Sequence, residues 1–166
     1  MTDDNRKTQF VSDFEKNIGI ILKISRAYTN TNHDREDLIN DIALELWKAY
    51  PKFNGDSKIS TWFYRIALNV SMNYKRKKKP DLMFYHEVNQ IKVSDWLDRE
   101  EENEQVDLLY ECIDDLNEFN KAIIILYLDG NSHDEISTIT GISKTNVGTR
   151  ISRIKEQLKE IAKQKN

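Results

Sequence analysis

One stretch of the chain, from about residue 60 to residue 79, combines side chains that can bind nucleic acid. Five of them recur at intervals of three and four, which places them on one side of a helix: Trp62, Arg65, Asn69, Asn73 and Arg76. An aromatic ring can stack on bases, guanidinium groups can hold phosphates, and amides can hydrogen-bond base edges. Taken alone, Trp62 is more often a core residue, and the cationic run 75–79 is more often a solvated helix end. Their coincidence favours nucleic acid.

Two predicted helices and a loop position this face. Asp34 is suited to cap a first amphipathic helix, and Pro51 ends its apolar pattern. The polar loop FNGDSK follows, and a second helix is predicted to begin at Ser60 or Thr61. An apolar stripe on this second helix lies beside the polar one and should face the core.

A second candidate interface lies near the C-terminus, where SHDEISTIT and a last helix form a helix-turn-helix pattern. Ser132 and Glu135 have the spacing of a capping box, Gly141 supplies the turn, and Ser143 is suited to cap the last helix. Such a helix enters the major groove with its N-terminal residues. The residues predicted to contact DNA there are Lys144, Thr145, Asn146, Thr149, Arg150 and Arg153. Helical hairpins of this kind also occur in proteins that never touch DNA, and the basic last helix is what favours DNA binding here.

The composition predicts an all-α protein, because 5 glycines and 2 prolines are too few for the many turns of an all-β fold. The single cysteine, Cys112, allows no disulfide within the chain and is predicted to lie in the core. With no long apolar segment, this fits a cytoplasmic protein without membrane insertion. The sequence has no metal-ligand spacing, glycine-rich phosphate loop or nucleophile elbow, so we expect neither an enzyme nor a cofactor.

The net charge of −3 seems to argue against a polyanionic partner, but the charge is segregated. All charges from residue 65 to residue 79 are positive, whereas nearly all from residue 87 to residue 118 are negative. From residue 144 onward, cations predominate again. Local charge, and not the total, determines where nucleic acid can bind.

We therefore predict two small helical domains joined by an acidic linker, over residues 1–80, 81–105 and 106–166. Residues 1–9 should be disordered, and residues 10–28 should form one helix. A short acidic helix is expected over about 94–105, with the apolar linker residues lying on a domain or a partner. In the last domain a helix is predicted over 118–128, and Gly130 sits where a left-handed helix stop would.

With both patterns in view, the chain resembles the bacterial RNA polymerase sigma factors of the extracytoplasmic-function (ECF) group. DREDLINDIALELW followed by FNGDSKISTWFYRIALNVSMNY is similar to the family's region two, and LDGNSHDEISTITGISKTNVGTRISRIK to its region four. The resemblance implies a specificity subunit that binds core polymerase, recognises the minus-ten and minus-thirty-five promoter elements, and promotes initiation by capturing a flipped base. The implied partners are core RNA polymerase (its β′ clamp helices and β flap), promoter DNA and an anti-sigma factor.

The resemblance also implies roles for single residues. The β′ clamp helices would bind Asp37, Leu38, Asn40, Asp41 and Glu45. The minus-ten element would be bound by Phe53, Asn54, Ser57, Lys58, Trp62, Arg65, Asn69, Asn73 and Arg76. This chain has Asn40-Asp41 where the family usually has Gln-Glu, and Gly148 where it often has a basic residue. A glycine cannot reach a base edge, so minus-thirty-five recognition should depend more on Lys144, Asn146, Arg150 and Arg153, although Arg150 could also pack its stem on the domain.

Two other functions stay open. A stand-alone helix-turn-helix regulator would account for the last domain, but it leaves FNGDSKISTWFYRIALN without a use and would normally need dimer symmetry. A helical interaction module would carry its basic faces as ordinary solvated surface. Polymerase-dependent promoter binding separates a sigma factor from the first alternative, and salt-dependent DNA binding by residues 106–166 would count against the second.

Overall fold

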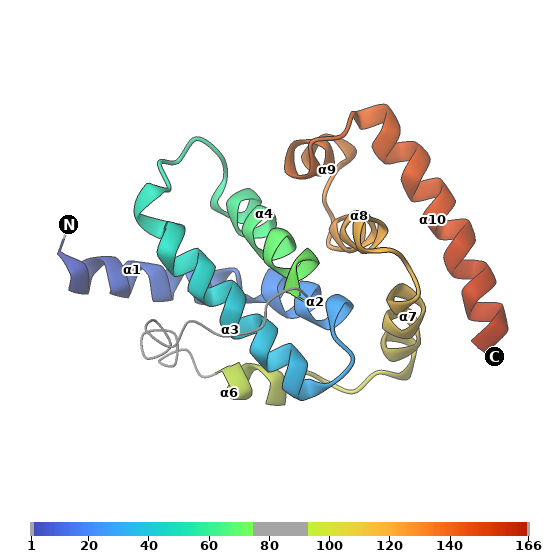
Figure 1. The fold of residues 1–166 in the computed structure, drawn as a ribbon, viewed down its shortest axis with the longest axis horizontal. Helices are drawn as coiled ribbons and strands as arrows, with labels where there is room; N and C mark the ends of the chain where they lie inside the picture. The colour runs from blue at the N-terminus through green and yellow to red at the C-terminus, as the bar shows by residue number, and fades with distance from the viewer. Residues whose placement is uncertain (1, 75–92, 166) are drawn as a thin grey trace.

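The computed structural model describes residues 2–74 and 93–165, and it is all-α, with no strand in these ranges. Figure 1 shows the N-terminal helices on one side of the molecule and the C-terminal helices on the other. This confirms the predicted fold class. Arg76 and the cationic run 75–79 lie outside the described residues.

The N-terminal half consists of α1 (Asp3–Lys16), α2 (Ile18–Tyr28), α3 (Asn32–Ala49), a short 3-10 turn η1 (Tyr50–Lys52) and α4 (Ile59–Met72). Helices α2, α3 and α4 pack against one another around fully buried side chains, among them Phe14, Ile21, Leu38, Ile42 and Phe63. The apolar stripes of α3 and α4 thus face the core as predicted. The polar faces of α3 and α4 point away from this core.

The N-terminal segment differs from the prediction in three places. Residue 1 lies outside the described residues, and the disorder predicted for the rest of 1–9 is wrong, because α1 begins at Asp3 and the Thr2 hydroxyl accepts a hydrogen bond from the backbone N–H of Asn5 at 3.3 Å. The single helix predicted over 10–28 is interrupted at Asn17, which separates α1 from α2. Helix α3 begins earlier than predicted, because its N-cap is Thr31, whose hydroxyl accepts from the Asp34 amide at 3.1 Å.

The linker contains α6 (Val93–Asp98), and the C-terminal half consists of α7 (Glu104–Asp114), α8 (Glu118–Leu128), α9 (His133–Thr140) and α10 (Lys144–Lys165). The bounds of α8 are those predicted. Gly130 and Gly141 have positive φ values of 87° and 84°, so each supplies a left-handed turn that a side chain would strain. Ser132 and Glu135 form the predicted capping box.

The described part of the linker lies on the N-terminal half. Helix α6 is shorter than the acidic helix predicted over 94–105, and it packs against α3. Val93 is buried, and Trp96 and Leu97 contact the core. Of the apolar linker residues that were expected to lie on a domain or a partner, Trp96 lies on a domain, whereas Leu82, Met83, Phe84 and Tyr85 lie outside the described residues. Cys112 is buried in α7, as predicted.

The two halves meet along an extensive contact, here called the seam. Helix α2 contacts α7 and α8, and α4 contacts α8 and α9. Buried residues from both halves belong to one hydrophobic cluster. The two halves share this buried cluster, so the packing does not test where one domain ends and the next begins. The division into residues 1–80, 81–105 and 106–166 stays a prediction.

Candidate nucleic-acid interface

The first candidate surface is the acidic side of α3. The carboxylate of Asp37 is 54% exposed and lies 3.6 Å from Nε2 of His33, and that of Glu45 lies 3.8 Å from Nζ of Lys48. Asn40, Asp41 and Glu45 are half-buried. The carboxylates of α3 lie close enough to the end of α4 to raise the pKa of Tyr74, after burial as the larger cause. The surface is therefore negatively charged along successive turns of one helix.

Leu38 does not belong to this surface. Its side chain is fully buried between the helices of the N-terminal half. It can support the acidic side of α3 only from behind, because a partner cannot reach it without opening the core.

The second candidate surface begins in the loop before α4. The Asn54 amide donates to Asp56 at 2.8 Å, and its oxygen accepts from the Asp56 backbone at 3.1 Å, so the loop is held by its own polar groups. Gly55, with φ 81°, completes the turn. Lys58 is exposed, whereas Phe53 and Ser57 are half-buried.

Aromatic rings support this loop from the side of α4. The Trp62 ring lies 5.1 Å from that of Phe53, 6.2 Å from that of Tyr50 and 5.6 Å from that of Phe63, measured between centroids. Trp62 is half-buried and packs against the core. The sequence allowed Trp62 to be either a core residue or a ring that stacks on bases. One side of its ring packs against the core, and the other side forms a wall of the loop.

The exposed face of α4 continues with Arg65, Asn69 and Asn73. The Asn73 amide donates to the Asn69 carbonyl of its own helix at 2.8 Å. The Arg65 guanidinium instead donates across the seam to the Thr138 carbonyl of α9 at 2.9 Å. One of the predicted DNA-binding side chains is thus bound to the other half of the molecule.

The third candidate surface is the first part of α10. The Ser143 hydroxyl accepts a hydrogen bond from the backbone N–H of Asn146 at 3.2 Å, which confirms Ser143 as the predicted cap. The exposed residues on this part of the helix are Lys144, Thr145, Asn146, Thr149 and Arg153. Val147, Ile151 and Ile154 are buried beneath them. The arrangement of α9, the Gly141 turn and α10 is the helix-turn-helix that the sequence predicts.

Arg150 lies apart from this exposed row. It is half-buried, its guanidinium lies 4.8 Å from the Phe119 ring centroid, and Nη1 donates to the Asn120 side chain at 3.3 Å. Its Nε atom is buried without a hydrogen-bond partner. Arg150 therefore ties α10 to α8 and has little of its side chain left for DNA.

Gly148 has a structural neighbour that the sequence did not indicate. A Cβ at this position would lie 3.6 Å from the imidazole ring of His133, which is an ordinary van der Waals distance. The His133 ring, from the first turn of α9, thus lies beside Gly148 on the side where a side chain would project.

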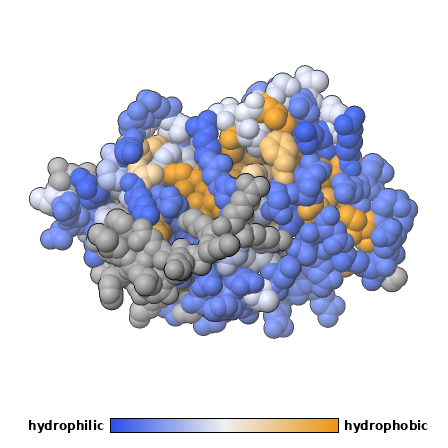
Figure 2. Space-filling view, in the orientation of Figure 1, coloured by the Kyte–Doolittle hydropathy of each residue, from blue (hydrophilic) through white to orange (hydrophobic). Residues whose placement is uncertain are grey.

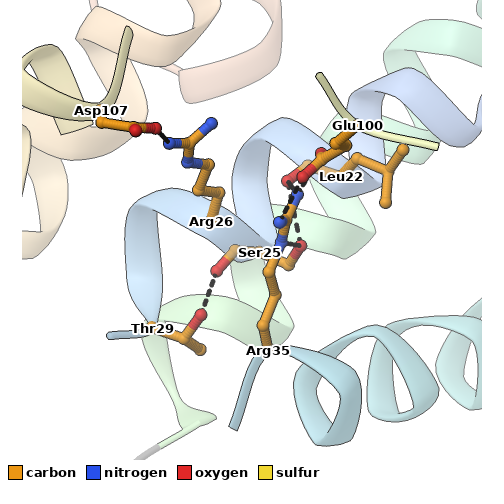
Figure 3. A network of polar contacts seen from close by, with 7 residues as sticks. All are labelled: Leu22, Ser25, Arg26, Thr29, Arg35, Glu100 and Asp107. Carbon is orange, nitrogen blue, oxygen red and sulfur yellow. Dashed lines mark hydrogen bonds and ion pairs between the residues drawn. The ribbon is translucent and has the colours of Figure 1, made fainter. Parts of the chain in front are cut away.

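Several polar residues that the sequence analysis did not single out connect distant parts of the chain (Figure 3). The buried Arg35 guanidinium binds both oxygens of Glu100, at 2.7 and 2.5 Å, and the Leu22 carbonyl at 2.8 Å. Arg26 pairs with Asp107. A signal for Arg35 was present, because it shares the apolar side of α3 with Leu38 and Ile42, where a charge needs a partner.

Other kinds of site find no support in the described ranges. No group of three or more His, Cys, Asp or Glu side chains there could hold a metal ion. Nor does any helix in these ranges combine the length and apolar character needed to cross a membrane.

The geometry defines an all-helical protein with an acidic helix surface, an aromatic-walled polar loop and a helix-turn-helix. The profile of Sigma-70 region 2 matches residues 14–80, and that of Sigma-70 region 4 matches residues 107–158. The sequence is 32% identical over 141 residues to the ECF RNA polymerase sigma factor SigW of Bacillus subtilis, covering 77% of this chain and 75% of that protein. The chain therefore belongs to the ECF sigma factors of the sigma-70 family.

Other relatives agree. The ECF RNA polymerase sigma-E factor of Escherichia coli is 30% identical over 139 residues, which cover 75% of this chain and 72% of that protein. The match to SigG of Mycobacterium tuberculosis, 34% identical over 79 residues, covers 46% of this chain and spans only about a fifth (21%) of that protein.

Solved structures share the fold. A sigma factor RpoE from Bartonella quintana, in complex with the anti-sigma factor NepR, aligns with a TM-score of 0.68 at 18% identity, covering 93% of this chain and 97% of that one. CnrH in complex with the cytosolic domain of CnrY aligns with a TM-score of 0.65 at 18% identity, covering 95% of this chain and 89% of that one.

Proposed function

We propose that this chain is a promoter-specificity subunit of RNA polymerase. It acts in the cytoplasm, binds core polymerase through the acidic side of α3, and binds the minus-ten element through the loop 53–58 and the exposed face of α4. The first part of α10 binds the minus-thirty-five element. An anti-sigma factor is a further partner in this proposal, because the RpoE of Bartonella quintana was solved in complex with the anti-sigma factor NepR.

One observation carries this proposal: α3 and α4 pack against each other and expose faces of opposite chemistry. The α3 face has the carboxylates of Asp37, Asp41 and Glu45, which suit a basic protein surface and repel DNA. The α4 face has Arg65 with the amides of Asn69 and Asn73, which suit phosphates and base edges. A single helix pair can therefore hold polymerase on one side and DNA on the other.

Opening the duplex needs no catalytic group in this proposal. Extruding a base costs a few kcal/mol of pairing and stacking. The rings of Phe53 and Trp62 offer a wall against which such a base can stack, and Asn54 and Ser57 offer polar groups near its edge. Stacking worth about 1–3 kcal/mol per base would offset much of the cost.

The test is binding to core RNA polymerase that has been freed of its own sigma factors. Asp41→Arg should abolish or strongly weaken the complex, because it reverses a charge in the middle of the α3 surface. Asp37→Arg is a second variant, since the Asp37 side chain is 54% exposed and its replacement leaves the core untouched. Asp3→Arg makes the same charge change at a side chain that is 96% exposed on α1 and serves as the matched control.

A tight complex that both α3 variants lose and Asp3→Arg keeps would support the proposal. Circular dichroism of each variant shows whether a loss of binding is a loss of folding. If the wild-type chain ignores core polymerase while it still binds duplex DNA in a salt-dependent manner, the proposal is wrong, and a stand-alone regulator becomes the better explanation.

A further inference from the structure

Helix α1 contacts the chain just before the loop 53–58 through the side chain of Tyr50. The Tyr50 hydroxyl donates a hydrogen bond to the Asp13 carboxylate of α1 at 2.5 Å. The Phe10 ring, about one turn earlier on α1, meets the Tyr50 ring edge-on, with 5.2 Å between the centroids and an angle of 70° between the planes. Phe10 is buried, whereas Asp13 and Tyr50 are half-buried. Helix α1 therefore holds Tyr50 both at its ring and at its polar tip.

Tyr50 in turn contacts two parts of the proposed base-binding surface. Its backbone carbonyl accepts from the backbone N–H of Phe53 at 3.1 Å, which fixes the direction in which the chain enters the loop. Its ring lies 6.2 Å from that of Trp62, which lies 5.1 Å from that of Phe53. Figure 1 shows this loop between α3 and α4, and in Figure 2 hydrophilic atoms in the same region lie above apolar ones. A displacement of Tyr50 would therefore reach both rings that form the wall of the loop.

The position of Asp13 is not favoured by its own helix. It lies in the last turn of α1, where the helix dipole disfavours a carboxylate. Its Oδ1 atom accepts only an exposed hydrogen bond from the Gln9 side chain at 3.3 Å, whereas its Oδ2 atom accepts from Tyr50, which is 37 residues away in sequence. Burial, followed by the hydrogen bond with Asp13, raises the pKa of the Tyr50 hydroxyl, so this group stays a donor at neutral pH. The contact with Tyr50 thus accounts for an acid at this position.

We propose that Asp13 and Tyr50 are positioning residues for base capture, and that α1 thereby holds the wall formed by Phe53 and Trp62 in place for the extruded base. This inference rests on the proposed function, because it takes the loop 53–58 as the base-binding site. A wall that is already ordered binds a base more tightly than one that the base itself must order. The matched Sigma-70 region 2 profile begins at residue 14, directly after Asp13, so this contribution comes from outside the matched segment.

The test measures the base-dependent part of single-strand binding by the full chain. One fluorescent probe is a mixed-sequence single-stranded DNA of about 12 nucleotides, and the other is an abasic strand of the same length, so that phosphate contacts cancel in the ratio of the two affinities. Tyr50→Phe, which removes the hydroxyl and keeps the ring, should reduce this ratio about three- to tenfold. Asp13→Ala should do the same, whereas Asp13→Asn keeps an oxygen that can accept from Tyr50 and should keep most of the ratio. The double variant of Tyr50→Phe and Asp13→Ala should lose no more than either single variant, because both remove the same hydrogen bond.

Tyr28→Phe is the matched control, because it removes a tyrosine hydroxyl that donates to the Glu118 carbonyl, in a contact between α2 and α8. It can lower the stability of the chain, but it should leave the ratio of affinities unchanged. If Tyr50→Phe and Asp13→Ala also lower only the stability and keep the wild-type ratio, the contact is purely structural and the inference is wrong. Losses that add up in the double variant would overturn it as well, since the two residues would then act separately.

Phe53→Ala separates a failure of this inference from a failure of the proposed function. It removes one ring of the wall itself, so it should lower the ratio even if α1 has no part in base capture. If Phe53→Ala lowers the ratio and Tyr50→Phe does not, the base-binding loop stands and only the role of α1 is refuted. If the wild-type chain binds both strands equally well, or Phe53→Ala leaves the ratio unchanged, the loop is not the base-binding surface, and the proposed minus-ten contact fails together with this inference.

Discussion

The contact between Arg35 and Glu100 allows a quantitative prediction: removing Glu100 should cost more stability than removing Arg35. The Arg35 side chain is 8% exposed and that of Glu100 is 32% exposed. In Glu100→Ala the guanidinium stays buried with only the Leu22 carbonyl at 2.8 Å and the Ser25 hydroxyl at 3.3 Å. Breaking a buried pair in this way costs about 3–5 kcal/mol, and partial exposure of Glu100 reduces the expected loss to about 2–3 kcal/mol.

The reverse change should cost less. In Arg35→Met the buried charge disappears, an apolar stem of similar length fills the space, and Glu100 can be hydrated at its exposed side. The Ser25 hydroxyl keeps its hydrogen bond to the Leu22 carbonyl at 3.0 Å. We therefore expect a loss of about 1–2 kcal/mol, less than for Glu100→Ala.

Urea unfolding followed by circular dichroism measures both free energies. Glu101→Ala, at the exposed neighbouring position, is the control and should stay within about 0.5 kcal/mol of the wild type. The reasoning is refuted if Glu100→Ala stays within that range too, or if Arg35→Met is the more costly of the two.

Three further predictions concern single features. Ser132→Ala removes one half of the capping box of α9 and should lower the free energy of unfolding by about 1 kcal/mol in urea titration, whereas an unchanged value would mean that the cap is not formed in solution. Gly148→Ala should raise the midpoint of thermal unfolding, because alanine favours a helix by about 1 kcal/mol and its Cβ meets only the His133 ring at 3.6 Å; a lower midpoint would show that the ring cannot accommodate it. Burial, followed by the charge of Glu118, raises the pKa of the Tyr28 hydroxyl in the folded chain. Stability is therefore fully present below about pH 10, where the unfolded tyrosine is neutral, and falls as the pH rises above it, and Tyr28→Phe should reduce the slope of stability against pH there.

Local features of the fold could be predicted from the sequence where a residue type at that position suits only one local conformation. Gly130 and Gly141 adopt positive φ, and Ser132 with Glu135 forms a reciprocal cap. The start of α3 was misjudged because several polar residues in TNTNHD can cap a helix, and only the backbone conformation selects Thr31. The interruption at Asn17 was missed because the apolar spacing continues on both sides of it.

The candidate site was predicted in outline but not in its relation to the rest of the molecule. Exposed positions such as Asn69 and Thr149 follow from helical spacing alone. Contacts between side chains far apart in sequence, such as Arg65 with the Thr138 carbonyl, depend on how two helical units pack, and no local pattern encodes that. The roles in promoter binding that the sequence assigns to single residues stay predictions.

The position of Arg150 bears on how promoter preference could be altered by mutation. Its stem and guanidinium are part of the packing between α8 and α10, so replacing it would disturb folding and recognition together. In libraries that randomise this position, a loss of stability and a loss of recognition would both be scored as inactivity. Thr145, Asn146 and Thr149 are exposed and can vary without such a loss. Under the proposed function, new promoter preferences are accessible through these three side chains, while Arg150 stays fixed as part of the scaffold.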